Sequence, residues 1–302
     1  MVAGKKSRAL RAESRAAYLC LIPSILGLVC ITYLPMLASF ALSFFDWNGL
    51  GAFKFAGFQN YLNLFTNDSK FYGSLLSTVK YAGLAVLASM LYSLFLAILL
   101  NRKVAARGFF RAVFYLPYVL PAMAVYLGWK WLFDYNHGLI NYVIMLLGGA
   151  KIKFLDSSAM VTPSLVLIAV WLSGNLIVIF LAGLQNVPRV YHEAAEVDGA
   201  NGFQRLVHIT LPYMTPIIFY NLLMSLVTNL QVITPALSLT KGGPGTGSYY
   251  MCYMLYQQAF KSHKYGYGSA IAVILFILIA IFTAILFKTS NSWIFYEGGE
   301  KE

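Results

Sequence analysis

The stretch "EAAEVDGANGFQRLVHITLP", residues 193–212, decides how this chain is interpreted. It holds three carboxylates, two glycines, an arginine and a histidine, although the chain as a whole is 59% hydrophobic and only 11% charged. Apolar runs long enough to cross a bilayer flank it on both sides. The pattern predicts a polar loop between two membrane spans.

The composition of the 302 residues predicts an integral membrane protein, because soluble domains carry roughly 25% charged residues. The formal net charge of +11 is ascribed to membrane topology and to contact with anionic lipid. Nucleic acid is not expected as a partner, since no basic soluble domain with interleaved aromatic residues is present. Cys20, Cys30 and Cys252 lack metal-ligand spacing, so neither a metal site nor a disulfide framework is expected.

Six apolar segments predict an all-α fold with six transmembrane helices. They cover residues 16–45, 75–100, 109–133, 161–185, 211–237 and 269–287. The first contains Pro23 and Pro35 and is expected to kink or to end in an interfacial turn. It is interpreted as an uncleaved span, because a signal peptide has an apolar region of only about 7–15 residues.

The positive charges predict that both termini are cytoplasmic. With that orientation the inside segments carry thirteen lysines and arginines and the outside loops carry seven, and all eight arginines fall inside. The expected organisation is a basic cytoplasmic tail at 1–15, a six-span permease domain at 16–289 and a cytoplasmic tail at 290–302. The polar loop, residues 187–211, then faces the cytoplasm.

The residue types in this loop predict a short helix across the cytoplasmic end of the spans. Pro188 suits the start of a helix, and Glu193 and Glu196 lie one turn apart near its N-terminal half, where the helix dipole favours carboxylates. Gly199 and Gly202 permit a chain reversal. Such a helix, with a smooth face at Ala194 and Ala195, could transmit force from a soluble partner; an ordinary surface loop is the alternative.

The loop resembles the signature of binding-protein-dependent ABC importer permeases, EAA-x3-G-x9-I-x-LP, with every fixed position filled. The presence of Asp198 and Gln204 at their positions in the loop resembles the sequences of the sugar-uptake branch of that family. Segments 55–65, 116–141, 239–260 and 265–272 also resemble the family, so the likeness covers nearly the whole chain. The six-span subunits of that branch are the best match.

The resemblance implies that the loop is a coupling helix that docks into a cleft of an ATPase subunit. The residues assigned to coupling by position are Glu193, Ala194, Ala195, Asp198, Gly199, Ile209, Leu211 and Pro212. It also implies a second homologous permease, a dimer of ATPase subunits that bind ATP and Mg, and an extracytoplasmic solute-binding protein. The expected location is a bacterial-type cytoplasmic membrane, which the chain crosses several times.

The chain shows no energy source of its own. It lacks a G-x-x-x-x-G-K-[ST] phosphate loop, so it is not expected to be an enzyme or to hold a cofactor; ATP hydrolysis would reside on the partner chain. The ionisable residues within the spans, Lys80, Arg111 and Lys130, lie near span ends, and no carboxylate lies at a midplane. An ion-coupled secondary sugar carrier is therefore the less favoured alternative.

A neutral polar stripe on the fifth span, formed by Asn221, Ser225 and Thr228, predicts a pathway for a sugar, with an oligosaccharide favoured. Such groups also bond helix to helix in membranes, and an ABC permease for another neutral or polyol-type solute remains an alternative. Gln231 ranks first among the substrate candidates because its place resembles the family's sugar-contacting segment. The candidates are Gln231, Asn229, Trp171, Asn175, Tyr118 and Tyr256.

Overall fold

The computed structural model describes residues 13, 17–102 and 106–295. Most of the expected N-terminal tail and residues 296–302 of the expected C-terminal tail lie outside the described residues, so the orientation of the termini stays a prediction. The chain divides into two compact units. One comprises residues 1–67 and 255–273, and the other comprises residues 68–254 and 274–302.

In the first unit, one apolar helix of 26 residues covers Ala17–Leu42. Its middle is a π-helical segment, η1 (Leu28–Tyr33), which leads into α2 (Leu34–Leu42). Pro35 stands at the start of α2 and has no N–H to donate to an α-helical hydrogen bond. The π-helical segment directly before α2 accommodates this missing donor. A kink or an interfacial turn was expected at Pro23 and Pro35. The structure instead has a π-helical segment within one continuous helix.

The same unit contains a small hairpin of β1 (Phe45–Asp46) and β2 (Lys54–Phe55), followed by α3 (Gln59–Thr66). Asn60 fastens α3 to the hairpin, because its Nδ2 donates to the carbonyls of Ser43 and Phe45 at 2.9 Å. The Trp47 carbonyl accepts from the N–H of Tyr265, the first residue of α15 (Tyr265–Ser290), at 3.0 Å. Segments that are distant in sequence thus meet at the hairpin.

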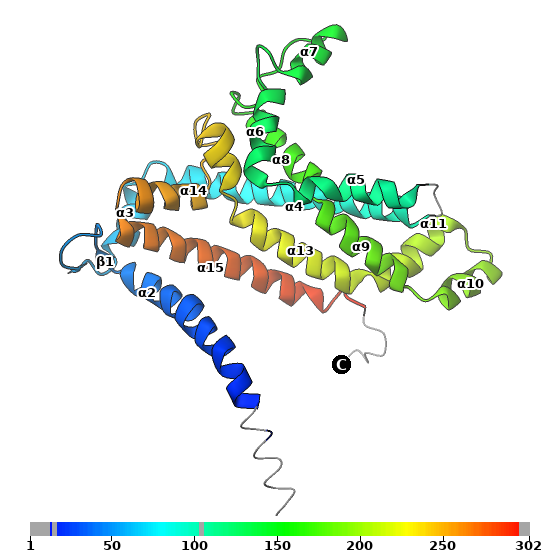
Figure 1. Ribbon diagram of the computed structural model, residues 1–302, viewed down its shortest axis with the longest axis horizontal. Coiled ribbons are helices and arrows are strands. Elements are labelled where there is room, and N and C mark those ends of the chain that lie inside the picture. Colours follow the sequence, from blue (N-terminus) through cyan, green and yellow to red (C-terminus); the bar gives the residue numbers. More distant parts are fainter. Residues whose placement is uncertain (1–12, 14–16, 103–105, 296–302) are drawn as a thin grey trace, which may run out of the picture. The chain divides into compact units, whose positions relative to one another are not determined.

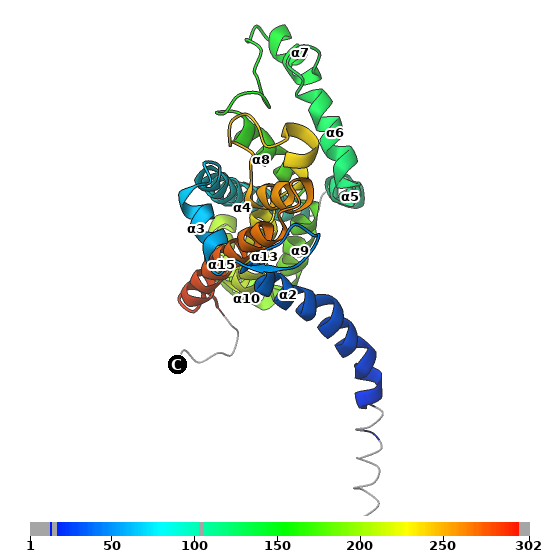
Figure 2. The same ribbon diagram turned by 90° about the vertical axis from the view of Figure 1, so that its left-hand side faces the viewer.

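In the second unit, the 31-residue helix α4 (Phe71–Asn101) packs against α8 (Val161–Trp171), α9 (Gly174–Asn186) and α13 (Thr215–Leu230) (Figures 1 and 2). Small buried residues on α4 allow these close contacts. Ser93 of α4 and Ser173 share a hydrogen bond of 2.9 Å between their hydroxyls. The chain's other helices are α5 (Arg107–Val119), α6 (Ala122–Leu132), α7 (Leu139–Leu146), α10 (Arg189–Val197), α11 (Gly202–Arg205), η2 (Leu206–Thr210), α12 (Leu211–Tyr213), η3 (Ala236–Thr240), α14 (Met251–Tyr256) and η4 (Gln257–Lys261).

Among the described residues, three helices are long and apolar enough to cross a membrane, and the number rises to six if each of three bent helix pairs forms one span. This agrees with the predicted number of spans. The pairs are α5 with α6, bent by 97°, α8 with α9, bent by 50°, and the helix Gly202–Tyr213 with α13, bent by 64°. The segments expected as spans at 109–133, 161–185 and 211–237 thus each contain a break between two helices.

The breaks have local causes. Pro121 cannot donate to the helix and pushes Leu120 into an extended conformation with ψ 146°, so α5 ends there. At the second break, Gly174 lies so close to α5 that a Cβ would stand 2.6 Å from the Phe114 carbonyl oxygen. The helix expected to reach residue 237 ends at Leu230, and a short segment follows without regular structure.

Candidate functional site

The coupling loop, residues 187–211, begins with a firmly capped helix. Pro188 precedes α10 with ψ 133°, as expected where a helix starts. At the other end Gly199 has φ +80°, its N–H donates to the Glu196 carbonyl at 3.1 Å, and the Ala200 N–H donates to the Ala195 carbonyl at 2.8 Å. These bonds form a Schellman motif, which needs the left-handed residue that glycine supplies without strain.

The second helix of the loop starts one residue later. The Asn201 Oδ1 accepts from the Gln204 N–H at 2.9 Å, and the Gln204 Oε1 accepts from the Asn201 N–H at 2.8 Å. This is a capping box, so Gln204 has a structural role in the loop. The chain reverses at Gly199 and not at Gly202, which is already the first residue of α11.

An ion pair closes the turn between the two helices. Glu196 Oε1 on α10 lies 2.6 Å from Arg205 Nη1 on α11. The Tyr191 ring of α10 lies 6.0 Å from the Tyr213 ring of α12, between centroids. The loop is therefore held by a motif at each corner and by contacts at both ends, rather than by two flexible corners.

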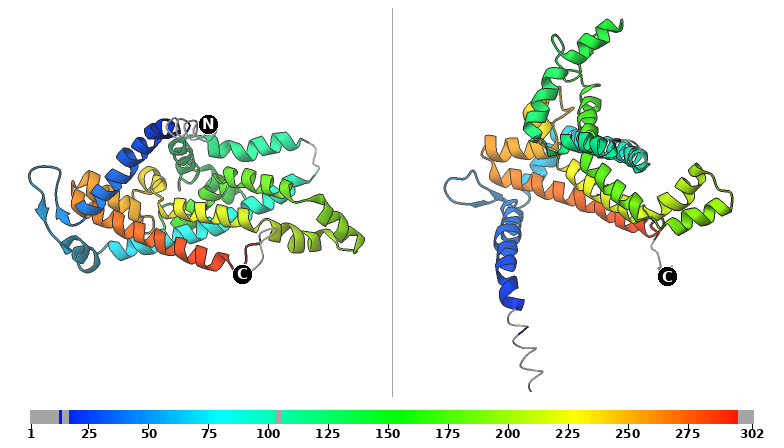
Figure 3. Two further views of the ribbon diagram at one scale, coloured as in Figure 1. Left: turned by 90° about the horizontal axis from the view of Figure 1, so that it is seen from below. Right: turned by 45° about the vertical axis from the view of Figure 1, so that its right-hand side comes forward.

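One face of α10 is apolar and largely exposed. No residue of α10 is buried, and Val190 and Val197 are 70% and 89% exposed on either side of Ala194. Their spacing of four and three residues places them on one face of the helix. Ala195 is half-buried, so the accessible face is formed by Val190, Ala194 and Val197, and not by Ala194 and Ala195 as expected. Figure 3 shows α10 and α11 beyond the ends of α9 and α13.

The two ends of the signature lie in different surroundings. Glu193, Asp198 and Gly199 are exposed on α10 and its cap. Ile209 packs against the buried cluster around Phe180. Leu211 and Pro212 are partly buried at the start of α12. The first half of the signature thus presents a surface, and the second half anchors that surface to the helix bundle.

A cavity of about 830 Å³ lies within the second unit, where three interruptions of the helices meet. Leu120 lines it at the α5–α6 break, Leu172 and Ser173 line it at the α8–α9 break, and residues 231–235 line it beyond α13. Non-helical backbone at membrane depth is tolerated where it borders protein or a water-filled cavity. Discontinuous helices around a cavity are the arrangement that transporters use to bind their substrates.

The cavity brings four of the six predicted substrate residues together. Gln231, Asn229, Asn175 and Tyr118 all line it. Asn229 Nδ2 donates to the Ser225 carbonyl at 2.8 Å, which leaves its amide oxygen available. Neutral amides, hydroxyls and aromatic rings line this space, and no Asp, Glu, Lys or Arg is among the lining residues.

The other two predicted residues lie elsewhere. The Trp171 ring packs edge-on against Trp129 with centroids 5.7 Å apart, and Trp171 does not line the cavity. The Tyr256 ring lies 5.8 Å from the Phe260 ring and 5.9 Å from the Lys261 ammonium. Both contacts satisfy the aromatic side chain within the fold, so neither residue needs a substrate to explain its surroundings.

Asn221 is a cavity residue that the list of substrate candidates left out. It is only 1% exposed, and neither its Nδ2 nor its Oδ1 has a hydrogen-bond partner in the described structure. A buried amide without partners costs about 1–3 kcal/mol, so its retention is a sign of a ligand or water at that place. The signal in the sequence was its helical stripe with Ser225 and Thr228, which also line the cavity.

The protein belongs to the binding-protein-dependent transport system inner membrane components, because the model of that family matches residues 89–295. The match contains the loop at 187–211 and every residue that lines the cavity except Tyr81. It defines a multi-pass membrane protein that acts as the permease part of a transport system and is not itself an enzyme.

Several curated proteins match over nearly their whole lengths. The "Probable ABC transporter permease protein YesP" of Bacillus subtilis is 39% identical over 98% of this chain and 97% of its own. The multiple sugar-binding transport system permease protein MsmF of Streptococcus mutans is 35% identical over 90% and 94%. A chain of a bacterial ABC transporter for import of the acidic polysaccharide alginate has the same fold, with a TM-score of 0.82, 21% identity, and 94% of this chain and 99% of that chain covered.

Proposed function

We propose that this chain is one of two permease subunits of an ATP-driven importer that moves a sugar, in particular an oligosaccharide, into the cytoplasm of a bacterium. Family membership supports the transport role. The names of relatives such as MsmF, the trehalose/maltose permease MalF of Thermococcus litoralis and the arabinooligosaccharide permease AraP of Bacillus subtilis support a sugar as cargo. The neutral polar lining of the cavity suits sugar hydroxyls.

The coupling role rests on one observation, which is the exposed apolar face of α10. Val190, Ala194 and Val197 form a face that water disfavours, on a helix that a Schellman motif ends. A helix that lays an apolar face into a groove is a common mode of recognition. We assign this face, with Glu193, to a cleft of an ATPase subunit, which would bind ATP and Mg.

Transport would proceed by alternating access. ATP binding would close the ATPase dimer and move the two capped helices of the coupling loop. Because Ile209 and Leu211 anchor the loop to the bundle, that movement would reach α13, whose far end borders the cavity. A second, homologous permease would complete the pathway, and an extracytoplasmic solute-binding protein would deliver the sugar. Both termini would be cytoplasmic.

The test is uptake into proteoliposomes that contain this chain, the second permease and the ATPase, with the solute-binding protein added. We expect uptake of a labelled oligosaccharide to require ATP and to fail with an imposed proton gradient alone. Uptake driven by the proton gradient without ATP would overturn the proposal. Competition by a panel of unlabelled neutral sugars and polyols distinguishes a sugar cargo from another neutral solute.

A further inference from the structure

Arg107 and Arg111 lie one turn apart on α5 and share one neutral acceptor. With its amide oxygen turned toward α5, Gln185 accepts from Nη2 of Arg107 at 3.1 Å and from Nη2 of Arg111 at 2.9 Å. The Nε atoms of both arginines are buried and have no hydrogen-bond partner among the described residues. Like charges one turn apart destabilise a helix, so an anion bound between the two arginines would stabilise α5.

The described part of the chain supplies no such counter-ion. Its one arginine–carboxylate pair is that between Arg205 and Glu196, and no carboxylate is paired with Arg107 or Arg111. A guanidinium presents its donors as a fork that matches the oxygens of a phosphate or a carboxylate. The unused donors therefore indicate an anion with at least two oxygens.

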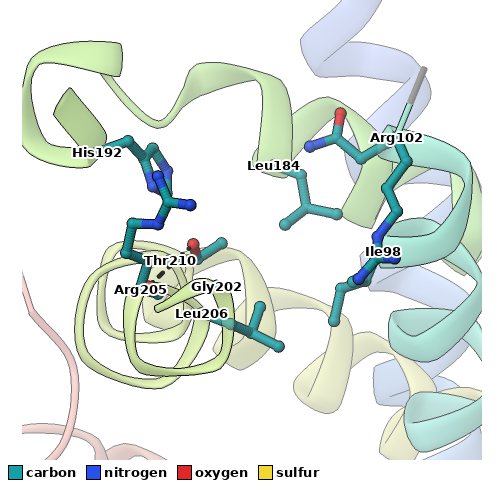
Figure 4. Close-up of a pocket in the computed structure, with 9 residues that line it drawn as sticks. Ile98, Arg102, Leu184, His192, Gly202, Arg205, Leu206 and Thr210 are labelled. Carbon is teal, nitrogen blue, oxygen red and sulfur yellow. Dashed lines mark hydrogen bonds between the residues drawn. The ribbon is translucent and has the colours of Figure 1, made fainter. Parts of the chain in front are cut away.

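A recess of about 300 Å³ continues this basic region. Asn101 links the two, since it lines the recess and its Oδ1 accepts from Arg107 Nη2 at 3.4 Å. Figure 4 shows Arg102 and Ile98 on one side of the recess, with His192 and Arg205 of the coupling loop on the other. The lining residues are Ile98, Asn101, Arg102, Leu184, His192, Gly202, Arg205, Leu206 and Thr210.

Apolar surface adjoins these charges. Ile98, Leu184 and Leu206 form part of the recess wall. On α5 itself, large apolar side chains are exposed next to the arginines; they are Phe109, Phe110, Val113 and Leu116. Basic side chains beside exposed apolar ones are the combination by which a protein surface binds acidic lipid. A free inorganic anion would use only the charges, whereas an acidic lipid would use the charges and the apolar surface together.

We propose that Arg107 and Arg111 bind the phosphate of an acidic phospholipid, with the rest of the headgroup directed toward the recess that Arg102, Arg205 and His192 line and the acyl chains along α5. Arg205 and His192 belong to the coupling loop, and Arg102 ends α4. A bound headgroup therefore joins the loop to the helix bundle and stabilises the loop's position.

Native mass spectrometry of the protein, purified in the complex in which it occurs, tests the site. Dioleoyl phosphatidylglycerol and dioleoyl phosphatidylcholine are added at equal concentrations. We expect Arg111→Gln to reduce the retained phosphatidylglycerol at least about fivefold, whereas Lys288→Gln, which removes an exposed charge at the end of α15, changes it less than about twofold. Arg111→Lys keeps the charge but not the fork and should fall between them.

Several results would overturn the proposal. Equal retention of the two lipids, or equal effects of Arg111→Gln and Lys288→Gln, would remove the acidic lipid as the ligand. Displacement of phosphatidylglycerol by inorganic phosphate at equal concentration would assign the site to a free anion. Loss of a protein subunit from Arg111→Gln with lipid retention unchanged would make a partner's carboxylate the counter-ion. Gel filtration of each variant shows whether the complex is intact, and none of these measurements depends on transport.

Discussion

Glu196 of α10 and Arg205 of α11 form an ion pair, with Oε1 and Nη1 2.6 Å apart, across a turn that is already closed by a Schellman motif and a capping box. The Glu196 side chain is 62% exposed, so the pair adds little to global stability. Its position suggests that it holds α10 at a fixed angle to the segment that leads into α12. If the loop couples transport to an ATPase, as proposed above, the pair should matter for the transmission of force more than for folding.

Glu196→Gln should reduce sugar-stimulated ATP hydrolysis of the reconstituted complex by about twofold to tenfold, while the cost in stability stays below about 1 kcal/mol. Arg205→Gln should cost at least as much, because Arg205 also lines the basic recess, and the double variant should be no worse than Arg205→Gln alone, because both substitutions break the same pair. Measurement of sugar-stimulated ATP hydrolysis in the wild type and all three variants completes a double-mutant cycle. Strictly additive losses would show that the two side chains act independently.

The left-handed conformation of Gly199 distinguishes two substitutions of similar size. No atom would lie within 4 Å of an added Cβ, so strain in the backbone at φ +80° is the main cost. Gly199→Ala should cost about 1–2 kcal/mol of local stability and weaken coupling. Gly199→Asn should keep most of the coupling, because asparagine tolerates the left-handed backbone conformation. ATPase stimulation by loaded binding protein is the measurement. Equal behaviour of the two variants would count against a role for the Schellman turn.

Val197→Ser should reduce the amount of ATPase subunit that copurifies with the chain by about tenfold, since it removes the most exposed apolar contact of the proposed docking face. The Tm of the isolated chain should not change, because Val197 is almost fully exposed. Val143→Ser on α7 is the matched control, an exposed valine outside the coupling loop. Retention of the ATPase at wild-type level would remove Val197 from the interface.

Asn221→Leu should leave the Tm unchanged or raise it, while uptake falls by about tenfold, because the amide has no partner within the described fold and is available to the substrate. Asn141→Leu is the contrasting control. Asn141 is also 1% exposed, but its Nδ2 donates to the Ile152 carbonyl at 3.0 Å and its Oδ1 accepts from the Ile152 N–H at 2.8 Å. A large loss of Tm in Asn221→Leu would show a structural partner for the amide.

Gly174→Ala should lower the Tm of the isolated chain by at least about 3 °C, since the added Cβ would lie 2.6 Å from the Phe114 carbonyl oxygen and 3.0 Å from the Tyr115 Cα. Backbone atoms cannot yield as a flexible side chain does. Gly128→Ala on α6 is the control, because nothing lies within 4 Å of its added Cβ and alanine favours a helix. Equal Tm values would mean that α5 and α9 can separate without cost.

Local chemistry explains which features were predictable. The ends of α9 and α10 follow from Pro188 and Gly199, residues whose backbone preferences act within one turn. Apolar length predicted where the chain can cross a membrane. The breaks at Leu172 and beyond Leu230 were missed, because hydropathy averages over a window and does not register a change of helix direction.

The cavity shows the same division between local and distant effects. Gln231 was chosen because its place resembles the family's sugar-contacting segment, and Asn229 was chosen as a neutral polar residue of the same span; both line the cavity. Trp171 was chosen as an aromatic ring that could stack on a sugar, but it packs against Trp129, whose position depends on the 97° bend between α5 and α6. No sequence spacing encodes a contact that depends on two helices meeting at an angle.

The sequence by itself determined the membrane character of this protein and its family, because composition and the filled EAA signature do not depend on how distant segments pack. It also determined the capped helix α10, through hydrogen bonds between near neighbours. Only the tertiary structure decided which face of α10 is free, which broken helices border the cavity and which arginines lack a counter-ion. Each of these depends on contacts between residues far apart in the chain, where steric fit and burial select the partners.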